Sequence, residues 1–211
     1  MIYELRTYTL KPGSQPTVAR NAGEVARDIR GDAYGKLEGY WLTEIGTLNQ
    51  VVHLWSYASF DERARLRTAL GENERWREEY LPLIRPHLIR QDIRLMRAVL
   101  PLKPPETTGN IYELRAYRFQ PTRIGEWAQR VADTIAVREE YSICSGAFVT
   151  DAGQPNEAVH IWPYPSLDAR AEARARAAQD SRWQSFLEAV LPLLEEMQST
   201  IMVPASHSPL K

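Results

Sequence analysis

Two stretches of the sequence are nearly identical although they lie 109 residues apart. Residues 2–8 read IYELRTY, and residues 111–117 read IYELRAY. Tyr, Leu and Thr or Ala alternate here with charged residues, which is typical of a β-strand with two different faces. A match of this length predicts that the same folding unit occurs twice in the chain.

A second, longer match supports the repeat. The pattern Asn-x-x-Val-His-x-Trp-x-Tyr begins at Asn49 and again at Asn156, and each copy runs on into Ser-x-x-x-Arg. The distance is now 107 residues, so the second copy has lost two residues between its first strand and this motif. Because many positions match in one register, we infer two homologous halves.

A proline-rich segment separates the halves. Residues 100–110 read LPLKPPETTGN, which suits neither a helix nor a central strand. We therefore expect a semi-rigid linker at 101–110, between a first domain at 1–100 and a second at 111–211. The repeat is too long for a solenoid unit, so each copy should be a small domain.

Each half predicts elements in the order β-α-β-β-α-β. In the first half, we expect strands at 2–10, 39–43, 50–57 and 88–99, with helices that begin after Ser14 and Ser59. In the second half, we expect a strand at 111–119, a helix at 123–140, a hairpin at 146–164, helices at 166–196 and a strand at 198–203. This order predicts an α+β fold made of two tandem ferredoxin-like domains. Each sheet needs a cover on its free face, so we expect the two sheets to pack against each other as a barrel-like pseudo-dimer.

The repeated motifs resemble those of the NIPSNAP family. Tyr-Glu-Leu-Arg-x-Tyr opens each half, and Asn-x-x-Val-His-x-Trp-x-Tyr with Ser-x-x-x-Arg follows, so the resemblance covers nearly the whole chain. It implies a dimeric α+β-barrel arrangement formed within one chain, with further association into a homo-oligomer. The wider superfamily contains cofactor-free monooxygenases, isomerases and haem enzymes, and the family's own biochemical role is poorly defined.

Composition excludes several classes of protein. The chain has 26 Lys and Arg against 27 Asp and Glu, so it lacks the basic excess that nucleic-acid binding requires. No apolar run is long enough to span a membrane, and the N-terminus has no signal or transit pattern. A single cysteine, Cys144, allows no intramolecular disulfide, and we expect its thiol to be inert. We expect a cytoplasmic protein.

One face of the strands carries the candidate site. Side chains alternate along a strand, so the His, Trp and Tyr of each repeated motif share a face, as do Glu, Arg and Tyr at the start of each half. We expect the aliphatic faces to meet the helices and these polar, aromatic faces to line an interior between the sheets. The candidate residues are Glu4, Arg6, Tyr8, His53, Trp55 and Tyr57 in the first half and Glu113, Arg115, Tyr117, His160, Trp162 and Tyr164 in the second.

These residue types suit acid–base chemistry on a planar or carbonyl-bearing small molecule. His53 and His160 are candidate proton shuttles, because His titrates near neutral pH. Arg6 and Arg115 are candidate catalytic residues that hold a carboxylate or a developing oxyanion. The tyrosines, tryptophans and glutamates are candidate substrate-binding residues. We predict a cofactor-independent enzyme of the monooxygenase, isomerase or lyase type.

Structural explanations stand beside this hypothesis. Each Glu–Arg pair can be a buried ion pair, the histidines can be satisfied core residues, and Trp76 and Trp183 are expected in the core. The Arg-rich runs at 63–67 and 170–176 are expected to be solvated helix faces. We expect no metal site, since no further ligands have a recognisable spacing. A non-catalytic scaffold and a haem-binding protein remain alternative functions.

Overall fold

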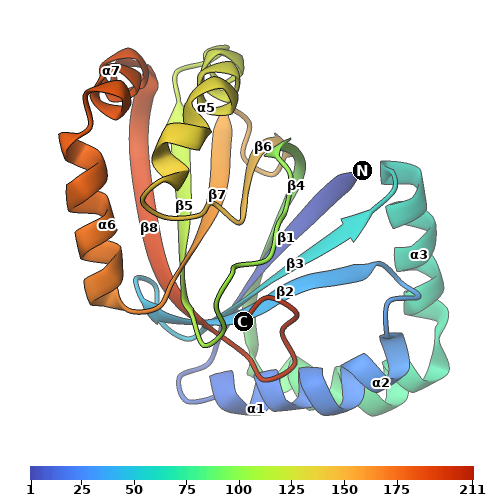
Figure 1. The fold of residues 1–211 in the computed structure, drawn as a ribbon. Helices are drawn as coiled ribbons and strands as arrows, with labels where there is room; N and C mark the ends of the chain where they lie inside the picture. The colour runs from blue at the N-terminus through green and yellow to red at the C-terminus, as the bar shows by residue number, and fades with distance from the viewer. The chain divides into compact units, whose positions relative to one another are not determined.

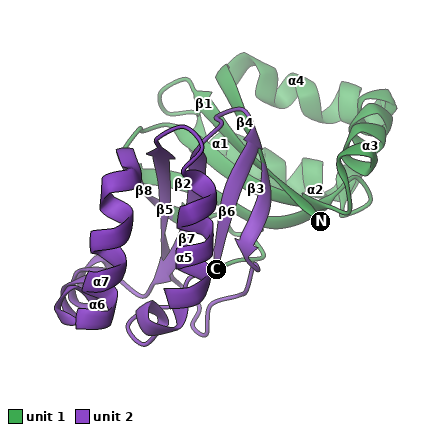
Figure 2. Cartoon of the chain, turned by 90° about the horizontal axis from the view of Figure 1, so that it is seen from above, with its two compact units in different colours: residues 1–95, 203–210 green, residues 96–202, 211 purple.

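A computed structural model describes all residues from 1 to 211. The chain divides into two compact units (Figure 2). Unit 1 contains residues 1–95 and 203–210, and unit 2 contains residues 96–202 and 211. Both units mix strands with helices, so the predicted α+β class is confirmed (Figure 1).

Unit 1 has the predicted element order. Its elements are β1 (Ile2–Leu10), α1 (Gln15–Asn21), the π-helical turn η1 (Ala22–Ala26), α2 (Arg27–Arg30), β2 (Lys36–Ile45), β3 (Gln50–Tyr57), α3 (Phe60–Glu72), the π-helical turn η2 (Trp76–Tyr80), α4 (Leu81–Ile84), the 3-10 turn η3 (Arg85–His87) and the first part of β4 (Leu88–Leu100).

Unit 2 repeats this order. After the end of β4 it contains β5 (Ile111–Phe119), α5 (Ile124–Glu139), β6 (Gly146–Ala152), β7 (Glu157–Tyr164), α6 (Leu167–Gln179), α7 (Ser181–Val190), the 3-10 turn η4 (Leu191–Leu193) and most of β8 (Leu194–Pro204). The predicted last helix ran to residue 196, but η4 ends at Leu193 and β8 begins at once, because Pro192 limits the helix to one short turn.

The repeated motifs lie on paired antiparallel strands. In unit 1, β3 pairs with β1 and places His53 opposite Arg6. In unit 2, β7 pairs with β5 and places His160 opposite Arg115. Directly opposite residues point to the same face of a sheet, so each unit brings its Arg and its His together.

Two strands pass from one unit into the other along the chain. β4 starts in unit 1 and ends in unit 2, whereas β8 starts in unit 2 and ends in unit 1. The backbone of Ala205 donates to the carbonyl oxygen of Tyr40 at 2.9 Å, which fixes the C-terminal segment in unit 1. Residues 101–110 form no helix or strand, and Lys103 donates to the carbonyl oxygen of Ser145 at 2.8 Å in unit 2. The boundary between the two sequence repeats therefore lies at residues 101–110. The boundaries between the two compact units lie elsewhere, within the strands β4 and β8.

Local signals explain several element boundaries. Ser59 caps α3, since its hydroxyl accepts from the backbone of Glu62 at 3.0 Å while the Glu62 carboxylate accepts from Ala58 at 2.6 Å. Asn49 and Asn156 close the two hairpins with φ of 56° and 61°, a conformation that Asn tolerates better than most residues. Ser14 precedes α1 as expected, but its hydroxyl bonds to His87 Nδ1 at 2.9 Å and caps nothing.

In each unit, the helices pack against the aromatic face of the sheet. The core of unit 1 joins Val51, Trp55 and Tyr57 of β3 to Ala22 and Ala26 of the first helical segment. The core of unit 2 likewise joins the aromatic strand residues Trp162 and Tyr164 to its helices, which here also supply the large side chains Trp127 and Phe186. The expected orientation, with the aliphatic faces toward the helices, was therefore wrong, because the large aromatic side chains of this face pack against helix residues, small alanines in unit 1 and larger side chains in unit 2. No helix of the structure is both long enough and apolar enough to cross a membrane.

Helix stability offers a first test of the fold. Gly125 lies in α5 at ordinary φ, and a Cβ there meets no atom within 4 Å. Gly125→Ala should therefore stabilise the protein by about 0.5–1 kcal/mol in urea denaturation. Gly109 is also surrounded by open space but has φ of +76°, so Gly109→Ala should destabilise it. Equal effects of the two substitutions would contradict these backbone conformations.

Candidate functional site

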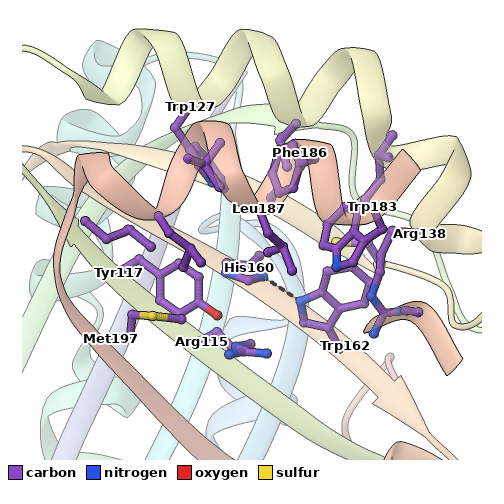
Figure 3. A pocket seen from close by; sticks show the side chains of 18 of the residues that line it. Arg115, Tyr117, Trp127, Arg138, His160, Trp162, Trp183, Phe186, Leu187 and Met197 are labelled. Carbon is purple, nitrogen blue, oxygen red and sulfur yellow. Dashed lines mark hydrogen bonds between the residues drawn. The ribbon is translucent and has the colours of Figure 1, made fainter. Parts of the chain in front are cut away.

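Each unit contains a cavity between its sheet and its own helices. The cavity of unit 1 measures about 350 Å³ and that of unit 2 about 190 Å³. Figure 3 shows the unit 2 cavity, with His160 on its strand facing Trp127, Phe186 and Leu187 from α5 and α7. The first volume lies within the usual range for ligand pockets, roughly 300–1,000 Å³, and the second falls below it.

The two cavities are lined by matching residues of the two repeats. At six matched positions, both cavities have the same residue type: arginine, tyrosine, histidine or tryptophan. They are Arg6 with Arg115, Tyr8 with Tyr117, His53 with His160, Trp55 with Trp162, Arg67 with Arg174 and Trp76 with Trp183. The repeat has therefore produced two versions of one site.

A wholly buried carboxylate organises the cations of unit 1. Glu4 is 0% exposed, and its Oε1 accepts from Arg6 at 2.6 Å and from Arg63 at 2.7 Å. Its Oε2 accepts from the hydroxyl of Tyr57 at 3.1 Å. Burial by itself raises the pKa of Glu4, but the two guanidinium groups outweigh it and hold the pKa below its ordinary value. The predicted Glu4–Arg6 ion pair is confirmed.

The matching carboxylate of unit 2 has a different set of partners. Glu113 is also 0% exposed, and Arg170 donates to both of its oxygens at 2.9 and 2.6 Å. The hydroxyl of Ser199 donates at 2.6 Å. Arg115 lies 3.8 Å away, which is outside hydrogen-bond distance, so its guanidinium is less engaged than that of Arg6. Burial raises the pKa of Glu113, but Arg170 and Ser199 bring it below its ordinary value.

Each cavity histidine is fixed in one tautomer by the tryptophan two residues later. Trp55 Nε1 donates to His53 Nδ1 at 2.6 Å, and Trp162 Nε1 donates to His160 Nδ1 at 2.5 Å (Figure 3). An indole N–H is only a donor, so Nδ1 is unprotonated and the neutral ring carries its proton on Nε2. The buried Nε2 of His160 has no protein partner. Each histidine therefore offers an N–H donor, and its lone pair is occupied.

Burial keeps both rings neutral. It lowers the pKa of His53 well below the ordinary value of 6.5, and Arg6 and Arg30 add to the effect. It lowers the pKa of His160 to about 3, with a further contribution from Arg115. A ring that is neutral and whose free lone pair already accepts a hydrogen bond is better suited to donate to a ligand than to remove a proton.

A second buried arginine lies on each tryptophan. Arg30 Cζ is 3.3 Å from the centre of the Trp55 ring, and its Nη2 donates to Tyr57 at 3.3 Å. In unit 2, the guanidinium group of Arg138 stacks on Trp162 in the same way, with Cζ 4.8 Å from the centre of the ring. Both arginines are 4% exposed, and each donates to hydroxyl or carbonyl oxygens without forming an ion pair with a carboxylate. Burial lowers the pKa of Arg30 to about 10, which leaves it charged at neutral pH.

Only some of the predicted residues reach a cavity. Those that line one are Arg6, Tyr8, His53 and Trp55 in unit 1 and Arg115, Tyr117, His160 and Trp162 in unit 2. Those that lie behind the lining are Glu4, Tyr57, Glu113 and Tyr164. They hold the lining arginines in place, because Tyr57 and Tyr164 accept from Arg30 and Arg138.

Sequence reasoning missed the arginines on the helices. The runs at 63–67 and 170–176 were expected to be solvated, but Arg63 and Arg170 bind the buried glutamates and Arg67 and Arg174 line the cavities. Their recurrence at the same spacing as the histidines was the available signal. Nothing in the sequence marked Arg30 and Arg138, because their helices align imperfectly across the two-residue deletion.

Two further side chains bear on the chemistry of the site. Cys144 lines the unit 2 cavity, and burial raises the pKa of its thiol to about 12, so it carries no thiolate at neutral pH. Trp76 and Trp183 are partly buried and pack against the cores as expected, and both also line the cavities. No group of three or more His, Cys, Asp or Glu side chains is arranged to hold a metal ion.

Comparisons with known proteins identify relatives over the full chain. The family model NIPSNAP matches residues 3–100 and 112–209. NipSnap homolog 1 of Danio rerio is 30% identical over 220 residues, covering 100% of this chain and 77% of that protein.

Two solved structures share the fold at low identity. A protein of Lactobacillus acidophilus provisionally named a monooxygenase has a TM-score of 0.71 at 9% identity, over 97% of this chain and 94% of that one. An anthrone oxidase-like protein has a TM-score of 0.65 at 10% identity, over 96% of this chain and 90% of that one.

The histidine environment predicts a specific pH dependence of stability. His160 has a folded pKa of about 3 against an ordinary value of 6.5, so the unfolded chain binds one more proton between these values. The contribution of His160 to the free energy of unfolding is complete above pH 6.5. It decreases as the pH is lowered below 6.5, by up to about 1.4 kcal/mol per pH unit.

The slope of the free energy of unfolding against pH measures the number of protons taken up on unfolding. In the variant His160→Gln, this number should be lower by about one between pH 6.5 and 5. Gln can still accept from Trp162 but does not titrate. Urea denaturation at several pH values measures the slope, and His53→Gln combined with His160→Gln should remove about two protons. An unchanged slope in both variants would show that the rings titrate normally in the folded state.

Proposed function

The chain belongs to the NIPSNAP family, and we propose that it binds a small molecule in the cavity of each unit. The observation that carries the proposal is the buried Nε2 of His160, a donor with no protein partner at the cavity of unit 2. A buried polar group without a partner costs about 1–3 kcal/mol, which a ligand oxygen would relieve.

The cavities resemble binding sites in their composition. Aromatic rings and aliphatic side chains form most of each wall, and a few polar groups converge on the space. Tyr8 and Tyr40 contact the His53 ring, with centroids at 4.8 and 5.2 Å, so the ring is held in one orientation. A fixed donor in an apolar cavity selects the orientation of its ligand.

A cofactor-independent enzyme is the second candidate function. The donors that would bind a ligand oxygen, the histidine Nε2–H and the arginines, are also those that would stabilise an enolate-like oxyanion. The two fold neighbours have names that refer to oxidation, which is compatible with such chemistry on a planar carbonyl compound. The histidine acts in this version as an oxyanion donor, because Trp162 occupies the lone pair that a base would need.

The same tautomer argues against haem ligation. A haem iron would take a ring nitrogen with a free lone pair, but Nδ1 accepts from the indole and Nε2 carries the proton. A scaffold protein needs no cavity with unpaired donors. The proposal therefore involves no cofactor.

We also propose the finer architecture. The order of elements in each unit and the fold neighbours that match over most of the chain support two ferredoxin-like halves in a dimeric α+β-barrel arrangement. Association into a homo-oligomer and a cytoplasmic location stay predictions.

Blocking the cavities tests ligand binding. Gly71 and Ala178 are matching positions on α3 and α6, both are exposed, and each lines its cavity. The double variant Gly71→Trp and Ala178→Trp should weaken binding of the neutral fluorescent probe N-phenyl-1-naphthylamine at least tenfold, which corresponds to about 1.4 kcal/mol. Fluorescence titration measures this, and Gly71→Trp alone should account for most of the loss, because the larger cavity is the one that accommodates the three rings of the probe.

Matched controls lie one helical turn earlier. Thr68 and Ala175 are exposed on the same helices and line neither cavity, so Thr68→Trp with Ala175→Trp should bind the probe as the original chain does. Absence of probe binding by the folded original chain, or equal binding by the blocked and control variants, would overturn the proposed function.

A further inference from the structure

The walls of both cavities carry cations and no carboxylate. Unit 2 presents Arg115, Arg138 and Arg174 to its cavity, and no Asp or Glu lines it. The unit 1 cavity is lined by five arginines, again without an acidic residue. From this asymmetry we propose that the ligand is a monocarboxylate with an aromatic body, its carboxylate facing the arginines and its ring among the aromatic side chains. This inference rests on the proposed function and names its ligand class.

The buried carboxylates do not neutralise these cations. In unit 1, Glu4 serves two arginines, Arg6 and Arg63, which leaves this cluster with a net positive charge. Arg30 donates only to a carbonyl oxygen and a hydroxyl, and its buried Nε has no hydrogen-bond partner. Arg67 forms no ion pair closer than 4 Å. Positive charge near an apolar cavity therefore lacks an anion, and a ligand carboxylate would supply it.

Unit 2 repeats the pattern with other partners. Arg170 takes both oxygens of Glu113, so Arg115 remains beyond hydrogen-bond distance and its buried Nε has no hydrogen-bond partner. Arg138 donates to two hydroxyls only. Because the same imbalance occurs in both halves with different partner residues, the feature common to them is the positive cavity itself.

The hydrogen-bond donors and the rings favour a carboxylate on an aromatic body. Guanidinium groups bind planar carboxylates with two parallel hydrogen bonds, and the histidine Nε2–H adds a neutral donor. Tyr117 and Trp127 lie beside His160, with ring centroids 4.7 and 6.1 Å from it, and offer aromatic surface. A single-ring acid matches the size of the smaller cavity, about 190 Å³.

Size separates the two cavities. Tyr40 in unit 1 corresponds to Ala147 in unit 2, and Tyr80 corresponds to Leu187. The unit 1 cavity is nevertheless the larger one, at about 350 Å³. We expect it to accept a longer acid than the unit 2 cavity does.

Calorimetry with three molecules of one shape tests the ligand class. 3-Phenylpropionate carries the carboxylate, 3-phenylpropionamide is neutral, and 3-phenylpropylamine is a cation. The acid should bind at least tenfold tighter than the amide, and the amine should not bind. Equal binding of acid and amide, or binding of the amine, would overturn the inference.

Removing the cavity arginines should remove this preference. Arg67→Met with Arg174→Met keeps the apolar stems and should weaken acid binding at least tenfold while amide binding stays unchanged. The matched control, Arg65→Met with Arg176→Met, removes two exposed cations from the same helices and should leave acid binding unchanged. Equal losses in the two variants would mean that general surface charge attracts the acid, which overturns the inference.

The neutral probe distinguishes this failure from failure of the proposed function. If N-phenyl-1-naphthylamine binds and the acid does not, the cavities bind small molecules but the ligand class is wrong. If neither binds to the folded chain, the proposed function fails together with the inference.

Discussion

The structure depends on one buried carboxylate in each unit. Glu4 and Glu113 are fully enclosed, and an enclosed carboxylate is tolerated only when cations and hydroxyls satisfy its oxygens. Glu4 thereby fixes Arg6 on its own strand, Arg63 on α3 and the Tyr57 hydroxyl. The helix and the sheet are joined through this group, and the cavity forms beside it.

From this carboxylate, a chain of contacts leads to the histidine. Tyr57 donates to Glu4 and accepts from Arg30, Arg30 lies on the Trp55 ring, and Trp55 donates to His53. Every link fixes the next side chain in one orientation, so Glu4 and Tyr57, which lie behind the cavity lining, support the Arg30 and Trp55 side chains that set the histidine tautomer. Such support is what keeps a polar donor in place inside an apolar wall.

Two copies of one site have diverged around a shared centre. The Arg, His, Trp and Tyr of each cavity are the same, whereas the partners of the glutamate differ: Arg6 and Arg63 in unit 1, and Arg170 with Ser199 in unit 2. The side chain above the histidine is Tyr40 in one unit and Ala147 in the other. Duplication within one chain thus allows one cavity to change its size while the other keeps its own.

The sequence by itself determined the repeat, the order of elements, the family and the face that carries His53 and His160, because these follow from local spacing and alternation along strands. It also indicated the Glu4–Arg6 ion pair, whose members are two residues apart on one strand. Only the tertiary structure decided that this face meets the helices, and that Arg30, Arg67, Arg138 and Arg174 complete the cavities. The physical reason is that the packing of strand side chains against helix side chains, and the partner that a buried charge selects, depend on distances between elements that are far apart in the chain.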